Sequence, residues 1–345
     1  MNMTIIFGII LIGTGAFMSG SFSIPFDKVK NWKWENYWLV YGFFAYIIMP
    51  LLACLIFSPD FLSVYQLLPA SKLIWIFFLG AIYGIANLTF GLSLRYLGVA
   101  LGYALSLGLM MAIGTVVPPI LDGRLAKMFE GAGGILLLSG IAVSLVGIVI
   151  SGYAGMLKNK QLEALKLAAV NKDFHLVKGL IAALFVGITG SSMALGIEQG
   201  GFITKSIIAN GTNPLFADSA LFLLLYSGSF ATTLIWCLYQ SKKGGSLSNF
   251  TKSNNNSLIK NYIYCGLAGF LWYINYVFFG MGKSSLGEFS FVAWGILMSL
   301  TIVFATLWGL YRGEWRGVNK HIKLLMWIGL ATLIFASFLI GLSSN

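Results

Sequence analysis

Ten apolar runs, each about 20 residues long, follow one another along the chain and constrain its fold more than any other feature. They cover residues 4–24, 37–57, 73–95, 98–121, 134–156, 177–197, 215–239, 258–281, 287–310 and 322–342. A helix of that length crosses a bilayer, and a backbone in lipid must satisfy its polar groups within its own segment. The runs therefore predict an all-α integral membrane protein with ten transmembrane helices.

The composition excludes a soluble domain. Only 10% of the residues are charged, whereas soluble domains carry about 25%. The net charge of +11 raises the alternative of a nucleic-acid partner, but no basic stripe with interleaved aromatic residues supports it. Basic cytoplasmic loops of a bacterial inner-membrane protein explain the charge better. The first run lacks a basic segment and a cleavage site, so we expect it to be retained as a span.

The positions of the lysines and arginines predict the orientation. Loops after the odd-numbered runs hold 17 of the 22 basic residues. Positive charge stays on the cytoplasmic side, which places both termini outside. Five spans per half is an odd number, so the second half enters the membrane from the opposite side. We therefore expect two five-helix inverted repeats, residues 1–156 and 177–345, joined by a cytoplasmic linker at 157–176.

A weak internal similarity also favours two related halves. GAIYGIANLTFGLSLRYLG at 80–98 and GFLWYINYVFFGMGKSSLG at 269–287 align without gaps, so that Gly80 meets Gly269 and Gly91 meets Gly280. Chance matching among glycine and phenylalanine is the alternative. Transporters with such repeats bind their substrate between the halves, near the bilayer midplane.

Smaller features refine this outline. Pro25 is expected to end the first span and Pro50 to kink the second, because proline breaks the helical hydrogen-bond ladder. The segment 241–257 is rich in Gly, Ser, Asn and Lys, which predicts a flexible cytoplasmic loop. Three cysteines lie far apart within apolar runs and are interpreted as small buried hydrophobic residues.

Motifs for enzymatic chemistry are missing from the sequence. It contains no Ser-His-Asp, HExxH, Walker or Rossmann pattern, and its carboxylates flank the spans. We therefore expect no enzyme, no nucleotide-driven pump, no cofactor, no metal site and no obligatory protein partner. A membrane-embedded enzyme or receptor is the more distant alternative.

Polar and aromatic residues on apolar helices are the remaining candidates for a site. They are Tyr83 and Asn87 in the third run, Trp272, Tyr273, Asn275 and Tyr276 in the eighth, and Trp294 and Ser299 in the ninth. Aromatic rings pack on apolar C–H faces and amides pair with hydroxyls, which suits a neutral polyhydroxylated ligand. The alternative is interhelical hydrogen bonding and an interfacial aromatic belt.

Coupling to an ion needs a titratable group. Glu35 follows Trp32-Lys-Trp34 at the mouth of the second span, and Arg95 on the same side is its natural counter-ion. The plain alternative for this motif is an interfacial aromatic anchor. Glu288, at the outer start of the ninth span, is the second choice.

Several of these segments resemble one family. IPFDKVKNWKWE, FLGAIYGIANLTFGLSLRYLGVALGYALSLG, GTVVPPILDGR and FLWYINYVFFGMG are similar to the L-rhamnose–proton symporter family, a branch of the drug/metabolite transporter superfamily. The resemblance implies ten spans, an inner-membrane location and L-rhamnose uptake driven by protons. It carries over Glu35, Asn87, Arg95, Tyr96 and Trp294 as site candidates.

The sequence thus predicts a secondary active transporter that imports L-rhamnose by proton symport and alternating access. The sugar is expected between the halves, contacted from spans three, four, eight and nine. The alternatives are an exporter or facilitator of other small metabolites with the same fold, and sodium-coupled sugar uptake.

Overall fold

The computed structural model describes residues 3–121, 131–165, 174–252, 257–286 and 293–342. Within these ranges every regular element is a helix. The elements are α1 (Met3–Ser21), η1 (Ile24–Lys28), α2 (Trp34–Phe43), η2 (Phe44–Ile48), α3 (Met49–Phe57), α4 (Phe61–Leu67), α5 (Ala70–Leu97), α6 (Val99–Leu121), α8 (Gly131–Ala164), α9 (Leu176–Gln199), α10 (Gly201–Ala209), η3 (Pro214–Phe216), α11 (Asp218–Lys243), η4 (Leu247–Phe250), α12 (Ser257–Leu286), α13 (Ala293–Tyr311) and α14 (Lys320–Leu342).

The helices are those of a membrane protein. Among the described residues, seven helical segments are long and apolar enough to cross a bilayer, and shorter apolar stretches lie at Leu101–Ile113 and Ile296–Tyr311. Large apolar side chains such as Ile74, Val149 and Ile235 are exposed on the outer surface. A soluble monomer rarely exposes so much apolar surface, so this surface faces lipid.

The two prolines act as expected. α1 ends at Ser21, and Pro25 lies in the first turn of the short helix η1. The second span contains a π-helical turn, η2, directly before Pro50. Proline cannot donate into the ladder, and a wider π turn accommodates the break.

One of two connections differs from the sequence-based expectation. α8 continues to Ala164, so the predicted linker begins as about two further turns of helix. The described part of the 241–257 loop is also held in place, because Asn36 Nδ2 donates to Ser246 O at 3.0 Å and Asn249 Nδ2 donates to Asn36 Oδ1 at 3.1 Å. The described part of this loop therefore contacts α2, and its flexibility stays a prediction.

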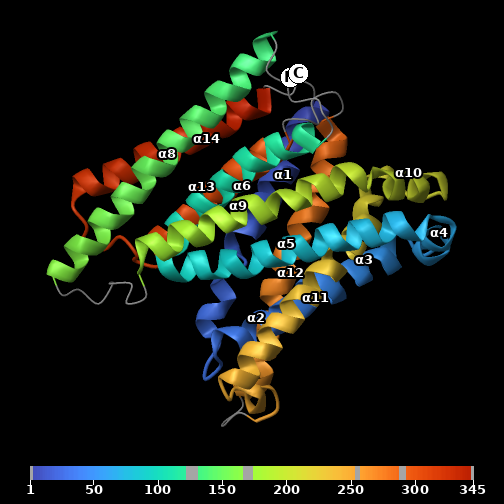
Figure 1. The fold of residues 1–345 in the computed structure, drawn as a ribbon, viewed down its shortest axis with the longest axis horizontal. Coiled ribbons are helices and arrows are strands. Elements are labelled where there is room, and N and C mark those ends of the chain that lie inside the picture. Colours follow the sequence, from blue (N-terminus) through green and yellow to red (C-terminus); the bar gives the residue numbers. More distant parts are fainter. Residues whose placement is uncertain (1–2, 122–130, 166–173, 253–256, 287–292, 343–345) are drawn as a thin grey trace.

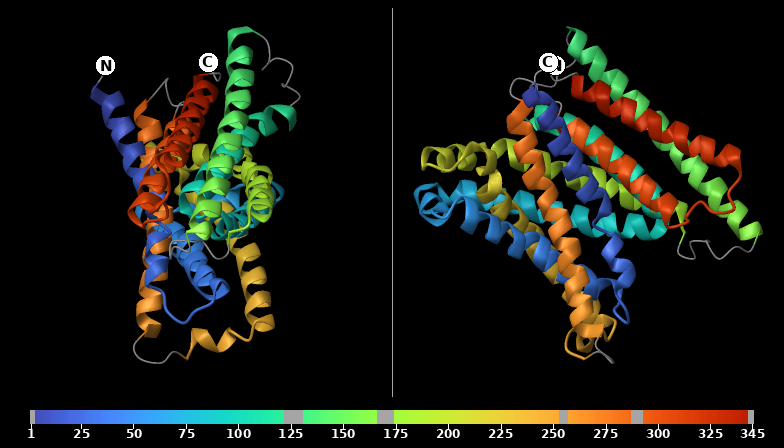
Figure 2. Two further views of the ribbon diagram at one scale, coloured as in Figure 1. Left: turned by 90° about the vertical axis from the view of Figure 1, so that its left-hand side faces the viewer. Right: turned by 180° about the vertical axis from the view of Figure 1, so that it is seen from behind.

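Helices α5 and α12 form the centre of the packing. α5 packs against α9 and α11, and α12 packs against α1 and against α2 with η2. α6 packs against α9, α13 packs against α1, and α6 and α13 also contact each other. α8 and α14 lie side by side along one flank (Figure 1). The first turns of α1 and the last turns of α14 lie at the same end of the molecule, opposite the α11–α12 connection (Figure 2).

Glycines permit the closest helix contacts. A Cβ atom on Gly80 of α5 would collide with the carbonyl oxygen of Leu225 in α11. A Cβ atom on Gly269 of α12 would lie 2.6 Å from Phe44 Cβ and 2.8 Å from Ala45 N, both in η2. The two glycines that the internal similarity pairs therefore both stand at backbone-to-backbone contacts.

Candidate functional site

Four buried tyrosines from four helices meet at the centre of the molecule. The hydroxyl oxygens of Tyr83 in α5 and Tyr276 in α12 lie 3.2 Å apart and share a hydrogen bond. The ring of Tyr226 from α11 lies 6.3 Å from that of Tyr83 and 5.5 Å from that of Tyr276, centroid to centroid. Tyr46 of η2 stacks on Tyr226 at 5.5 Å and 15°. We call these four residues the tyrosine cluster.

Both candidate asparagines lie beside this cluster and are buried. The amide nitrogen of Asn87 donates to Tyr83 O, one turn earlier, at 3.3 Å. The amide nitrogen of Asn275 donates to Trp272 O. Each of these bonds uses one amide hydrogen within its own helix, whereas an amide has two donor hydrogens and an acceptor oxygen. They also fix the side-chain orientations of both asparagines.

The other candidates from the eighth span are buried too. The ring of Trp272 lies 4.7 Å from that of Phe22, centroid to centroid. Tyr273 and Tyr276 line a small cavity of about 10 Å³ beside η3, together with Leu215 and Asp218. The structure therefore brings Tyr83, Asn87, Trp272, Tyr273 and Asn275 into one buried region.

Tyr96 does not join them. It lies 13 residues after Tyr83 on the straight helix α5, which is about 20 Å along the axis. There its carbonyl oxygen accepts a hydrogen bond from His175 N at 3.2 Å. Trp294 and Ser299 lie on α13, but their side chains are outside the described part of the structure. Glu288 also lies outside the described residues.

Glu35 lies at the start of α2, against the α11–α12 connection. Its Oε1 accepts a hydrogen bond from Ser246 Oγ at 2.7 Å. Next to it, Lys33 Nζ donates to Gly244 O at 2.7 Å. Arg95 lines a different part of the protein, a cavity whose lining residues include Asp27 and not Glu35. The suggested Glu35–Arg95 pair stays a prediction.

That cavity has a volume of about 240 Å³ and lies between η1, α2, the end of α5 and the end of α13. Aromatic side chains of η1 and α2 line it, and so do charged side chains of η1, of α5 and of the residue directly after α13. They are Phe26, Trp34, Tyr37 and Trp38, and Asp27, Arg95 and Arg312. We call it the inner cavity, because its charged residues belong to the loops and helix ends that the charge distribution predicts to lie on the cytoplasmic side.

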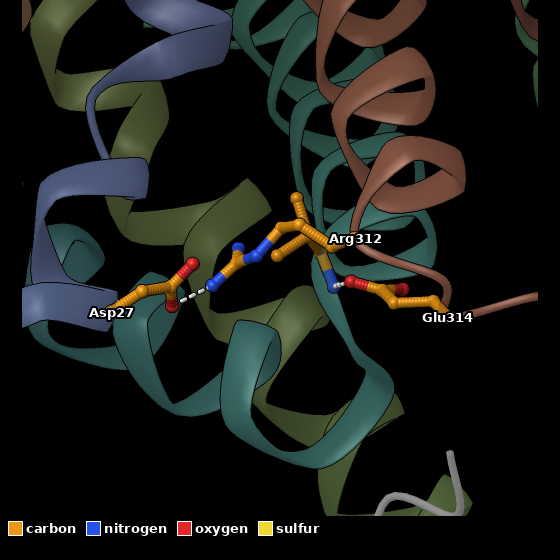
Figure 3. A network of polar contacts seen from close by, with 4 residues as sticks. Asp27, Arg312 and Glu314 are labelled. Carbon is orange, nitrogen blue, oxygen red and sulfur yellow. Dashed lines mark hydrogen bonds and ion pairs between the residues drawn. The ribbon is translucent and has the colours of Figure 1, made fainter.

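Two of the residues that line the inner cavity form an ion pair. The guanidinium group of Arg312 pairs with the carboxylate of Asp27 (Figure 3). Two residues further on, Glu314 Oε1 accepts a hydrogen bond from Val99 N, the first amide of α6, at 3.0 Å. Its Oε2 lies 4.0 Å from Nζ of Lys158, a side chain that is only 3% exposed. These contacts tie the α13–α14 loop to η1, α6 and α8.

Trp38, Asp27 and Arg312 line the inner cavity and were not predicted as site residues. Trp38 lies one helical turn after Trp34 on α2, so the i, i+4 spacing of two tryptophans was a usable signal. Asp27 and Arg312 are 285 positions apart, and no periodicity within one span connects them.

Comparison with known proteins identifies the family. The family model described as "L-rhamnose-proton symport protein" matches residues 1–345. The chain belongs to this L-rhamnose–proton symport family. The L-rhamnose-proton symporters of Pectobacterium atrosepticum and Yersinia pestis are each 31% identical to it, and the alignments cover 99% of this chain and 99% of each relative. No solved structure matches the chain. The resemblance noted from the motifs is therefore confirmed over the whole length.

Proposed function

We propose that this member of the L-rhamnose–proton symport family imports L-rhamnose together with protons across the bacterial inner membrane. The observation that carries the proposal is the family match over residues 1–345. The central region supports it, because its buried tyrosine, tryptophan and asparagine side chains suit a neutral sugar. The transport work then comes from the proton gradient, with no nucleotide or cofactor.

We further propose that ten helices span the membrane as two inverted repeats, divided at residues 156 and 177. In this scheme α1, α2–α3, α5, α6 and α8 form the first repeat, and α9, α11, α12, α13 and α14 form the second. In chain order, the scheme pairs α1 with α9, α2–α3 with α11, α5 with α12, α6 with α13 and α8 with α14. If each helix is replaced by its partner, the contacts of α5 with α9 and α11 correspond to the contacts of α12 with α1 and α2. By the same exchange, the contact of α6 with α9 corresponds to that of α13 with α1, and the contact between α8 and α14 is its own counterpart. Two repeats related by a two-fold axis require this pattern.

Glycine and proline positions support the same scheme. Gly80 and Gly269, which one offset relates, make the equivalent contacts of α5 with α11 and of α12 with the second span. The same offset relates Pro25 in η1 to Pro214 in η3. Each proline lies in the first two residues of a short 3-10 helix, η1 ahead of α2 and η3 ahead of α11, and the scheme pairs α2 with α11.

The two cavities suggest which way the transporter faces. Gly91 lines the inner cavity, and its equivalent Gly280 lines the small cavity beside η3. The inner cavity has a volume of about 240 Å³ and its counterpart only about 10 Å³. We infer an inward-facing conformation. In the outward-facing conformation, the cavity beside η3 would be the larger one and the inner cavity the smaller one. Sugar and proton shift the equilibrium between the two conformations because they bind them with different affinity.

Reporter fusions test the proposed orientation. A fusion after Asn345 should report the periplasm, and an insertion at Gly244 should report the cytoplasm, because 17 of 22 basic residues lie in the odd-numbered loops. Paired alkaline phosphatase and fluorescent-protein fusions give complementary signals at each site. A cytoplasmic signal at Asn345 would contradict the inverted topology.

Thermal melting of the purified protein tests the sugar. L-rhamnose should raise the melting temperature progressively with concentration, since a ligand of the native state stabilises it by mass action. L-mannose, which adds a hydroxyl in place of a hydrogen on the methyl group, should act more weakly, and sugar phosphates should have no effect. Stabilisation by a sugar phosphate without stabilisation by L-rhamnose would refute the proposed substrate.

The Glu35→Gln variant tests the proposed proton carrier. Glutamine keeps an acceptor for the Ser246 hydroxyl but has no charge to titrate. We expect vesicles with this variant to exchange L-rhamnose normally and to lose accumulation driven by a pH gradient. Glu163→Gln is the matched control, because that carboxylate accepts a hydrogen bond from Asn159 on the same side of the protein. Undiminished pH-driven accumulation by Glu35→Gln would assign the proton to another group.

A further inference from the structure

The inner cavity contains features that the central site does not account for. Trp34, Tyr37 and Trp38 lie at positions i, i+3 and i+4 of α2 and so share one face of the helix. All three line the cavity. An interfacial belt explains aromatic residues at a lipid boundary, but it does not explain aromatic residues around an internal cavity.

We propose that the inner cavity is a second sugar-binding site, on the cytoplasmic side of the tyrosine cluster, in which the indole N–H of Trp38 donates to a ligand hydroxyl. This inference rests on the proposed function and names a place where the same substrate class binds before release. The ligand is a neutral monosaccharide with one apolar face.

The aromatic wall is held rigidly. The rings of Trp34 and Trp38 stack with centroids 5.2 Å apart and planes at 19°. The centroid of Trp38 also lies 5.0 Å from that of Tyr41. A Cβ atom on Gly91 would lie 2.9 Å from both Trp34 Cζ2 and Trp38 Cη2, so only glycine lets α5 approach both rings this closely. A fixed aromatic surface of this kind suits the C–H face or the methyl group of a deoxy sugar.

The indole N–H of Trp38 is an unpaired hydrogen-bond donor. Its side chain is 2% exposed, and Nε1 has no acceptor among the described residues. A buried donor without an acceptor destabilises a fold. Indole can only donate, so the missing partner must be an acceptor, and a sugar hydroxyl oxygen meets this requirement.

The opposite wall supplies both kinds of hydrogen-bonding partner. Arg95 and Arg312 present donors and Asp27 presents acceptors. Sugar hydroxyls donate and accept, so they suit such a mixed wall better than an anion, which would face Asp27, or a cation, which would face two arginines. The volume of about 240 Å³ lies just below the range for drug-sized ligands, which fits a single sugar ring.

Two tryptophan variants test the proposal. Trp38→Phe keeps an aromatic ring and removes the indole N–H. Trp32→Phe is the matched control, because Trp32 Nε1 is also buried without an acceptor among the described residues, yet its ring packs on Phe250 and Tyr262 outside the cavity. In calorimetric titrations of the purified full-length protein, we expect Trp38→Phe to weaken L-rhamnose binding by about 2- to 10-fold and Trp32→Phe to leave it unchanged.

Stability separates a binding role from a structural one. Each substitution replaces a packed indole with a smaller ring, so we expect both variants to melt below the wild-type protein in the absence of sugar, whereas only Trp38→Phe should lose affinity for L-rhamnose. Monodeoxy analogues of L-rhamnose then locate the bond, since the analogue that lacks the contacted hydroxyl should bind Trp38→Phe and wild type equally. Equal L-rhamnose affinity of Trp38→Phe and wild type, or equal losses in both variants, would overturn the second site.

The test also separates this inference from the proposed function. If the wild-type protein binds no L-rhamnose, the proposed substrate is wrong, and the same two variants are titrated with a panel of neutral monosaccharides. A ligand whose affinity depends on Trp38 and not on Trp32 supports the second site. A panel without such a ligand refutes it.

Discussion

Replacing Gly80 with alanine is expected to prevent the close contact of α5 with α11. The new Cβ atom would collide with the carbonyl oxygen of Leu225, and a backbone atom cannot rotate away as a side chain can. On the other side of the same contact, a Cβ atom on Gly228 would collide with the carbonyl oxygen of Phe77. We expect a loss of stability at or above the upper end of the about 1–3 kcal/mol typical of overpacking. L-rhamnose transport should be lost with it.

Melting temperature in detergent and vesicle uptake measure this effect. Gly152→Ala is the matched control, since a Cβ atom at this position in α8 meets no atom within 4 Å. That variant should be as stable as the wild type, or more stable by up to about 1 kcal/mol, because alanine favours the helix. Gly269→Ala should act like Gly80→Ala if the two positions are equivalent. Normal uptake by Gly80→Ala would show that α5 and α11 can separate without loss of function.

Replacing Glu314 with alanine is the second change with a large expected effect. It removes the acceptor of the first α6 amide and leaves Lys158, 3% exposed, without its carboxylate neighbour. Breaking a fully buried pair from one side costs about 3–5 kcal/mol. The 19% exposure of Glu314 and the 4.0 Å separation reduce this to roughly 2 kcal/mol, since solvent screens part of the interaction.

Variants at Lys158 isolate the charge effect. Lys158→Met removes the buried ammonium group and keeps the contact between an aliphatic chain and the Trp315 ring, over which Lys158 Nζ lies at 4.9 Å. We expect the double variant Glu314→Ala/Lys158→Met to recover most of the melting temperature that Glu314→Ala loses. Equal melting of the single and double variants would mean that the uncapped α6 amide accounts for the whole loss.

The sequence is informative about the helices because lipid imposes one condition on every span. An apolar run of sufficient length must be helical, so the positions of α5, α11 and α12 followed from composition alone. The pairing of Gly80 with Gly269 was also visible, since glycine stands where backbones touch. The continuation of α8 to Ala164 was not visible, because polarity alone does not separate a loop from a cytoplasmic helix.

The contacts of the inner cavity could not be predicted in the same way. Asp27, Arg312 and Glu314 lie in connections whose positions depend on how the whole bundle packs. Glu35 was singled out for its charge and its aromatic neighbours, yet its hydrogen-bond partner is Ser246, 211 positions away. Trp38 was overlooked because an unpaired indole N–H becomes apparent only when every neighbour is in place.

The ion pair of Asp27 with Arg312 has a further consequence for a transporter built from two repeats. If the halves were identical, the inward-facing and outward-facing states would have equal energy, so the balance between them depends on positions where the halves differ. The offset that relates Pro25 to Pro214 relates Asp27 to Phe216, whose ring stacks on Phe57 at 4.0 Å. Dissolved salt screens an exposed ion pair but leaves an aromatic stack almost unchanged. In the proposed orientation, this ion pair makes the resting conformation sensitive to the salt concentration of the cytoplasm, whereas the stack of Phe216 on Phe57 adds no such sensitivity on the periplasmic side.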